Sequence, residues 1–288
     1  MPHRTRPPFA RRGARAARSG GCDSGDVVGE SVAEAYGRRW SAGAAVRAEH
    51  FAALSRPAWE AVLAAVGVGE GTTLLDVACG SGELAALARA RGAAVHGIDA
   101  AEAMIALART AVPGADLRVG TLEALPWPDA AFDVVTGFNA FQFAPDVVAA
   151  LAEAARVTRP GGRVAVCNWG GAGPQDLVAV THDLQALAPD AALVPRRPIG
   201  EPGVLEELLR AAGLRPSAAG DVAAPYAPPD RRTLERGMFA AGNLRHVERH
   251  LGPEAAAAAL ATAAAPFRRA DGSYLFHSTF RWVVARRD

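Results

Sequence analysis

Between Thr72 and Trp169 the sequence alternates short apolar runs with helical segments. The apolar runs are rich in valine and lie at 73–78, 93–99, 115–120, 132–138 and 162–169. Predicted helices at 83–91, 101–111 and 146–158 separate most of them. Short apolar strands joined by helices are typical of parallel sheets with helical crossovers. The sequence therefore predicts an α/β fold with a doubly wound, Rossmann-like, mostly parallel sheet.

The flanking segments follow a different pattern. Residues 30–66 have a helical pattern, and Pro57 suggests that a helix starts near it. After Trp169 we expect helices at 176–188, at 206–212 and within 230–265, where breaks near 242 and 252 leave two or three helices. The closing stretch 273–286 is strand-like, and we expect it to join the sheet as an antiparallel C-terminal strand.

The first predicted strand leads into a glycine-bearing turn, in the stretch LLDVACGSGELA at 74–85. A glycine turn between strand and helix lets a ligand approach the backbone closely. Residues 80–85 match the dinucleotide fingerprint G-x-G-x-x-G/A, a weak signal by itself, and simple packing is the alternative. Asp76 and Glu83 flank the turn, and two carboxylates would repel a pyrophosphate. They suit S-adenosylmethionine, which has an ammonium, a sulfonium and no phosphate.

Asp99 ends the second predicted strand, seventeen residues after Gly82. An acid at this place can accept hydrogen bonds from both ribose hydroxyls of a bound nucleoside. Capping of the helix at 101–111 is the alternative role. Because Asp99 stands in register with the glycine turn, we favour the ribose role.

Four blocks of the sequence, in order, carry a resemblance to a known family. They are LLDVACGSG, HGIDAAEAMIALAR, GTLEALPWPDAAFDVV and ARVTRPGGRVAVCNW, all within 72–169. Over this third of the chain, the sequence resembles the class I S-adenosylmethionine-dependent methyltransferases. It is most similar to their small-molecule branch, which includes the ubiquinone- and menaquinone-biosynthesis enzymes.

The resemblance implies roles for individual residues. Asp76 and Gly80 would hold the methionine end of the cofactor, and Asp99 its ribose. Ala78 stands where the family often has its first glycine, and Thr121 where many relatives have an Asp that accepts from the adenine amino group. The other expected cofactor residues are Ala100 and Met104 against the adenine, Leu122 on its other face, and Gly137 and Asn139 beside the sulfonium.

The substrate side is expected around GFNAFQF at 137–143, because three phenylalanines there would form an aromatic mouth near the methyl group. Core packing is the alternative role for each ring. The predicted substrate residues are Phe138, Phe141, Gln142, Tyr36 and Trp40. As general base we rank His182 first, since it lies in the segment after the fifth strand that often forms a lid in this family; a solvent-exposed or capping histidine is the alternative.

The resemblance thus implies transfer of a methyl group from S-adenosylmethionine to oxygen, nitrogen or carbon of a small, apolar or aromatic molecule. One alternative is an enzyme that binds the cofactor without methylating, such as a cyclase. An NAD-binding oxidoreductase is disfavoured by Asp76 and Glu83. A nucleic-acid methyltransferase is disfavoured because Gly137-Phe138-Asn139-Ala140 replaces the Asn/Asp-Pro-Pro-aromatic turn of those enzymes and because the formal net charge is only +1. A protein-binding scaffold would leave the glycine turn unexplained.

The amino-acid composition limits the possible chemistry and the expected location of the protein. All 31 basic residues are arginine, which excludes a lysine Schiff base. The three cysteines are scattered without zinc-ligand spacing, so we expect no metal site and a reducing, cytoplasmic location. No apolar stretch reaches the roughly 20 residues of a membrane span. The oligomeric state stays open.

We divide the chain into five parts. They are a disordered arginine-rich tail (1–28), a helical cap (29–71), a cofactor-binding core (72–169), lid and substrate-recognition helices placed among the later strands (170–272), and a closing strand (273–288).

Overall fold

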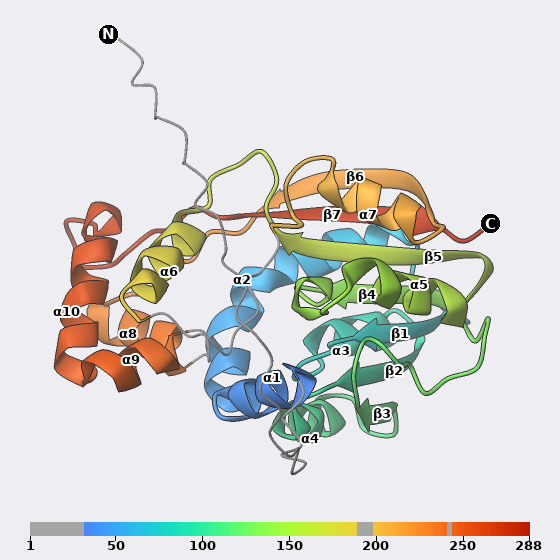
Figure 1. Cartoon of the computed structure of the whole chain (residues 1–288), viewed down its shortest axis with the longest axis horizontal. Helices are drawn as coiled ribbons and strands as arrows, with labels where there is room; N and C mark the ends of the chain where they lie inside the picture. The colour runs from blue at the N-terminus through green and yellow to red at the C-terminus, as the bar shows by residue number, and fades with distance from the viewer. Residues whose placement is uncertain (1–31, 189–197, 241–243) are drawn as a thin grey trace, which may run out of the picture. The chain divides into compact units, whose positions relative to one another are not determined.

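The computed structural model describes residues 32–188, 198–240 and 244–288, so the predicted tail at 1–28 lies outside the described residues. Seven strands form one sheet in the order β3-β2-β1-β4-β5-β7-β6 (Figure 1). They are β1 (Thr73–Val77), β2 (Ala94–Asp99), β3 (Asp116–Val119), β4 (Phe132–Phe138), β5 (Thr158–Trp169), β6 (Arg215–Ala223) and β7 (Thr279–Arg286).

The sheet is mostly parallel. Strand β1 pairs in parallel with β2 and with β4, and β4 pairs in parallel with β5. Strand β7 runs antiparallel to both β5 and β6. The predicted Rossmann-like sheet with an antiparallel C-terminal strand is therefore confirmed. The strand order reverses between β1 and β4, and the carboxyl ends of strands at such a reversal are where open α/β sheets bind ligands.

Helices cover both faces of the sheet, because successive residues of each buried strand point to opposite sides. Leu74 and Val134 enter one buried apolar cluster with residues of α2 and α3, whereas Leu75 and Val135 enter another with residues of α5 and α7. The helices are α1 (Val32–Ser41), α2 (Ala44–Ala65), α3 (Glu83–Ala90), α4 (Glu102–Ala111), α5 (Val147–Val157), α6 (Asp176–Ala186), α7 (Val204–Ala211), α8 (Arg231–Ala240), α9 (Arg245–Leu251) and α10 (Pro253–Ala264). Figure 1 shows α6, α8, α9 and α10 gathered beyond one end of the sheet, beside α2.

The helical stretch predicted at 30–66 is divided into α1 and α2, and Pro57 lies inside α2 instead of starting a helix. A proline inside a helix costs about 3 kcal/mol through a lost hydrogen bond and a clash. Next to it, Ala58, Val62 and Leu63 are almost fully buried in the core. Burial of a side chain such as Val or Leu contributes about 1.5–3 kcal/mol, so packing of this face outweighs the cost of the proline.

The strands differ from the prediction chiefly in one strand that was not predicted and in two strands that begin elsewhere. Strand β6 was not predicted, because Pro216, Gly220 and Asp221 have low strand propensity; as an edge strand it needs little burial. Strand β5 begins at Thr158 instead of 162, and a register shift against β4 accommodates the extra residues. Strand β7 begins only at Thr279, whereas we expected residue 273.

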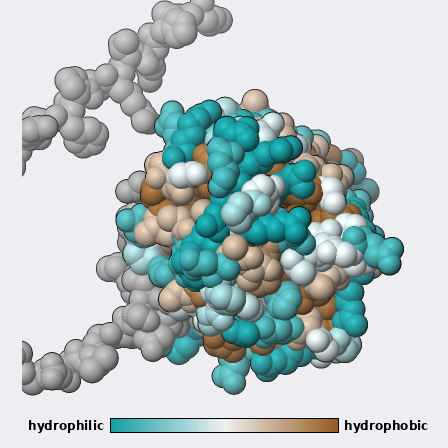
Figure 2. Space-filling view, turned by 90° about the vertical axis from the view of Figure 1, so that its right-hand side faces the viewer, coloured by the Kyte–Doolittle hydropathy of each residue, from teal (hydrophilic) through white to brown (hydrophobic). Residues whose placement is uncertain are grey.

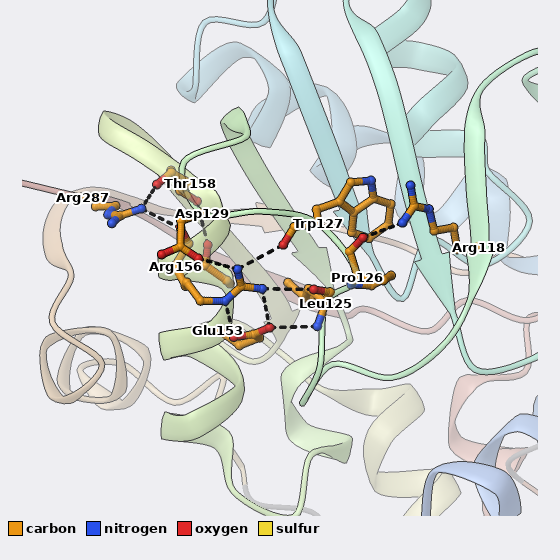
Figure 3. A network of polar contacts seen from close by, with 10 residues as sticks. Arg118, Leu125, Pro126, Trp127, Asp129, Glu153, Arg156, Thr158 and Arg287 are labelled. Carbon is orange, nitrogen blue, oxygen red and sulfur yellow. Dashed lines mark hydrogen bonds and ion pairs between the residues drawn. The ribbon is translucent and has the colours of Figure 1, made fainter.

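The long loop between β3 and β4 is fixed by Arg156 of α5 (Figure 3). The guanidinium donates to the backbone carbonyl groups of Leu125 and Trp127, both at 3.0 Å. It also donates to the carboxylates of Asp129 and Glu153. One side chain therefore joins the loop to α5, and the same loop carries Thr121 and Leu122 toward the carboxyl ends of the strands.

The face shown in Figure 2, opposite the helices α6 and α8–α10, is mostly hydrophilic, and its apolar residues form small separate patches. Cys79 and Cys167 are free and buried. Among the described residues, no helix has both the length and the apolar character needed to cross a membrane.

Candidate functional site

A cavity of about 1170 Å³, including its open mouth, lies at the carboxyl ends of β1, β2 and β4. Its floor is formed by the segments that follow β1, β2, β3 and β4, and its roof by α1 and α2. This is the strand-order reversal at which a doubly wound sheet binds its ligand.

The glycine turn after β1 takes the backbone shape that its sequence predicts. Gly80 and Gly82 have φ values of +56° and +88°, in the left-handed region that glycine adopts without strain. A Cβ at Gly82 would also lie 3.0 Å from Cα of Ala108, so only glycine lets α3 begin this close to α4. Ala78 adopts the same region with φ of +56°, although a side chain makes it costly there.

Asp76, in β1, is a carboxyl group buried in the cavity floor. Only 2% of the residue is exposed, and Thr136 Oγ1 donates to its Oδ1 at 2.8 Å. Burial raises the pKa of Asp76 to about 7; the Thr136 hydrogen bond lowers this pKa, and the charges of Asp99 and Glu83 raise it further. A cation bound beside this carboxyl group would therefore lower its pKa and favour loss of its proton.

Asp99, at the end of β2, joins two loops. Its Oδ2 accepts from the backbone N–H of Gly80 at 2.9 Å, and its Oδ1 accepts from that of Ala101 at 2.8 Å. Burial raises the pKa of Asp99, while the two N–H groups and the charge of Arg47 lower it. The ribose and helix-end roles considered for this residue are compatible, because a carboxylate has acceptor capacity beyond these two bonds.

Glu83 adds a third carboxyl group at the first residue of α3, where Ser81 Oγ donates to its Oε1 at 2.6 Å. Three acids on one cavity floor repel a pyrophosphate and attract a cation. The floor therefore fits S-adenosylmethionine, with its ammonium and sulfonium groups, better than NAD.

The cavity wall contains every predicted cofactor residue except Gly137. Ala100 and Met104 lie beside α1, whose Gly37 approaches the carbonyl of Ala100 so closely that a Cβ would be 2.4 Å from its oxygen. Thr121 and Leu122 line the wall from the β3–β4 loop. Asn139 has φ of +49°, and its Oδ1 accepts from the N–H of Trp169 at 3.1 Å, which ties the end of β4 to that of β5.

Several predicted residues lie elsewhere. Gly137 is covered by the ring of Phe141, which is itself 1% exposed and belongs to the core. Gln142 does not line the cavity, and neither does His182, which is exposed on α6. Tyr36, Trp40 and Phe138 do line it.

Helix α2 supplies lining residues that sequence reasoning missed, namely Arg47, Phe51, Ser55 and Trp59. They recur every four residues, so they share one helix face, and this spacing is the signal that could have found them. The ring of Trp59 lies edge-to-face with that of Phe138, with centroids 5.8 Å apart. Phe143 joins the wall between the rings of Tyr36 and Trp40.

Comparison with known proteins shows what the sequence around this site is similar to. Residues 75–166 match the family model described as a methyltransferase domain. The chain is 38% identical over 133 residues to the malonyl-[acyl-carrier protein] O-methyltransferase of Serratia marcescens, over 46% of this chain and 50% of that protein. It is 36% identical over 180 residues to the 27-O-demethylrifamycin SV methyltransferase of Amycolatopsis mediterranei (strain S699), over 58% of this chain and 62% of that protein. The chain thus spans about half the length of the first of these relatives.

The fold, too, resembles that of a solved methyltransferase structure. The crystal structure of geranyl diphosphate C-methyltransferase from Streptomyces coelicolor A3(2) superimposes with a TM-score of 0.55 and 16% identity, over 90% of this chain and 99% of that one. At an identity this low, the superposition shows only that the two chains share a fold. The matched domain over 75–166 and the relatives above 30% identity thus show that the part of the chain that forms the cofactor side of this site is similar to methyltransferases.

Proposed function

We propose that the protein transfers a methyl group from S-adenosylmethionine to a small acceptor with an apolar or aromatic body. The observation that carries the proposal is one cavity with two unlike sides. Its floor presents the carboxyl groups of Asp76, Glu83 and Asp99 beside a glycine turn, and its other wall is largely aromatic. The methyltransferase relatives support the same activity.

The floor would hold the cofactor. Asp76 would accept from the ammonium of the methionine end, beside Gly80 and the adjoining Ala78, and Asp99 from the ribose hydroxyls. Ala100, Met104 and Leu122 would enclose the adenine, and Thr121 would offer its hydroxyl to the adenine amino group. When bound, the cofactor supplies an activated methyl group. The residues of the chain position that group and keep water away.

The aromatic wall would receive the acceptor. Tyr36, Trp40 and Phe138 line it together with Phe51, Trp59 and Phe143. Such rings exclude water and interact favourably with a nearby cation. We propose that the chain accelerates transfer mainly by aligning the acceptor with the methyl group. His182 as a proton acceptor would have to act from outside this wall.

The test is formation of S-adenosylhomocysteine and of a product heavier by one methylene group, from a panel of planar phenols, enols and carboxylic acids. We expect product with wild-type protein and little with Asp99→Ala. If the wild-type protein binds S-adenosylmethionine but leaves it intact with every member of the panel, the proposed acceptor class is wrong, and a non-methylating role such as cyclisation becomes the better account.

A further inference from the structure

Asn139, the first residue after β4, has a side chain with one polar end fixed and the other end free. Its Oδ1 accepts from the backbone N–H of Trp169 at 3.1 Å. Only the oxygen of a carboxamide can accept from an N–H group, so this bond determines which way round the amide lies. The Nδ2 group, which carries two N–H donors, is therefore turned away from Trp169.

The Nδ2 group faces the cavity. Asn139 belongs to the cavity wall and is only 9% exposed. Among the residues that the structure describes, none accepts a hydrogen bond from Nδ2, and Nδ2 is nevertheless open to solvent. For a residue so nearly buried, the cavity is where that opening lies. Two hydrogen-bond donors thus point into the cavity with no protein acceptor in the described part of the chain.

These donors suit an oxygen atom and not the sulfonium beside which the resemblance places Asn139. The hydrogen end of an N–H group is positive, so it repels a cation and attracts the lone pair of an oxygen. Two ligands would bring an oxygen into the cavity: the cofactor, through the carboxylate of its methionine end, and the acceptor. The arrangement proposed above puts the methionine end at Asp76 and Gly80.

The neighbours of Asn139 favour the acceptor. Phe138 directly precedes it, and the ring of Phe138 lies edge-to-face with that of Trp59 on α2, with centroids 5.8 Å apart. Phe143 follows four residues later and also lines the cavity. All three rings belong to the aromatic wall proposed to receive the acceptor. Asn139 thus adds a pair of donors to a wall that is otherwise largely aromatic.

We propose, building on the proposed function, that the Nδ2 group of Asn139 donates a hydrogen bond to an oxygen of the acceptor and thereby selects acceptors with a carbonyl, carboxylate, enolate or phenolate oxygen. An amine of the same shape presents N–H groups of its own, and a hydrocarbon leaves the two donors unsatisfied, which costs free energy where water is excluded. Asn139 is then a specificity-determining residue of the acceptor site. Its backbone fits this role, because the φ of +49° lies in the left-handed region, which Asn and Asp adopt more readily than other residues with a Cβ.

Two probes of nearly the same shape test this inference. 2-Acetylnaphthalene carries a carbonyl oxygen, and 2-isopropenylnaphthalene has a CH₂ group in its place. The ketone cannot donate, so a hydrogen bond to its oxygen must come from the protein. Equilibrium dialysis at pH 8 measures the affinity of the full chain, saturated with S-adenosylhomocysteine, for each probe. The ratio of the two affinities, compared between wild-type protein and variants, isolates the contribution of the oxygen.

Asn139→Asp replaces the Nδ2 donor by an oxygen and leaves the other oxygen to accept from the N–H of Trp169. We expect it to lower the ketone-to-hydrocarbon ratio by about three- to tenfold, the scale of one hydrogen bond, and to change the affinity for the hydrocarbon less than about twofold. Asn139→Gly removes the side chain, suits the left-handed φ and should lower the ratio in the same way.

A matched variant controls for the charge. Asn168→Asp makes the same substitution on β5, in a residue that does not line the cavity, and should leave the ratio unchanged. Retained S-adenosylhomocysteine binding shows that each variant is folded, and Asn139→Gly carries the test if the Asp variant does not fold.

The outcomes separate the inference from the proposed function. If S-adenosylhomocysteine does not bind the wild-type protein, the proposed function fails and the inference fails with it. If it binds, but neither probe does or the Asn139 variants keep the wild-type ratio, Asn139 does not hold an acceptor oxygen and only the inference is wrong. If Asn139→Asp weakens S-adenosylhomocysteine and leaves the ratio intact, Asn139 bonds the carboxylate of the cofactor and the inference is again wrong.

Discussion

The Oδ2 atom of Asp99 accepts a 2.9 Å hydrogen bond from the backbone N–H of Gly80, and this bond joins the end of β2 to the glycine turn after β1. The two elements lie next to each other in the sheet, since β1 pairs with β2 throughout its length. The residue proposed to bind the ribose thus also fixes the turn proposed to receive the methionine end. Loss of this carboxylate should affect both parts of the cofactor site.

We therefore expect Asp99→Ala to weaken S-adenosylhomocysteine binding by about 1–3 kcal/mol, the scale of lost hydrogen bonds to a charged group. Isothermal titration calorimetry measures the change. Asp183→Ala, which removes an exposed carboxylate on α6, is the matched control and should bind like the wild-type protein. Unchanged affinity in Asp99→Ala would contradict the ribose assignment.

Cofactor binding should release a proton near neutral pH. Burial raises the pKa of Asp76 to about 7, whereas an ammonium group bound beside it would lower that pKa. We expect affinity to decrease as pH falls from 8 to 6. At pH 7, calorimetry in phosphate and in Tris should give different binding enthalpies, because the two buffers take up the released proton with different heats. Equal enthalpies in the two buffers would exclude this linkage.

The same carboxyl group gives the empty protein a predictable pH dependence. The folded pKa of Asp76 lies above the unfolded value of about 3.9, so folding favours the neutral form. Its stabilising contribution is complete below about pH 4 and is lost as pH rises through about 7. Asp76→Asn should therefore raise the urea midpoint of the empty protein more at pH 8 than at pH 5, and it should abolish the proton release. A larger gain at pH 5 would reverse the sign and refute the argument.

The sequence predicted β1 and β4 well because these central strands are buried on both faces and rich in apolar residues. Strand β4 has the predicted bounds, 132–138, and β1 to β3 end within a residue of theirs. Strand β6 was missed because an edge strand needs few apolar residues. Pro57 was misread because local propensity does not show that packing of α2 outweighs it.

Site residues could be predicted where their positions follow from the order of strands along the chain. Residues at or just after the carboxyl ends of parallel strands, such as Asp99 and Thr121, meet at one edge of any doubly wound sheet. Residues whose role depends on packing could not be assigned: Phe141 turns into the core beneath Gly137, and His182 points to solvent. Arg47 was missed because its place depends on how α2 lies over the sheet, which no local pattern shows.

Ala78 stores backbone strain that glycine would relieve. A left-handed conformation costs a residue with a Cβ about 1–2 kcal/mol. Ala78→Gly removes this cost, but glycine also adds conformational entropy to the unfolded chain, so we expect a net gain of at most about 1 kcal/mol in the free energy of unfolding. Urea unfolding measures it. Ala86→Gly within α3 should instead lose about 1 kcal/mol, and a similar loss in Ala78→Gly would show that Ala78 is unstrained.

Arg156 should stabilise the protein far more than an exposed arginine does. Its side chain bonds two loop carbonyl groups and two carboxylates, so Arg156→Met leaves several partners unsatisfied. We expect a loss of about 2–4 kcal/mol in the free energy of unfolding. Arg215→Met breaks an exposed pair with Asp288, which water and salt screen, and should change the free energy of unfolding far less. Equal losses in the two variants would show that the β3–β4 loop does not depend on Arg156.

The most direct test of the account is parallel calorimetric titration of the full chain with S-adenosylmethionine, S-adenosylhomocysteine and NAD. The three carboxyl groups around the glycine turn predict that both sulfur-containing nucleosides bind and that NAD, with its pyrophosphate, gives no binding heat. If NAD binds while S-adenosylmethionine and S-adenosylhomocysteine do not, the cavity is not a methyl-donor site and the central claim is wrong.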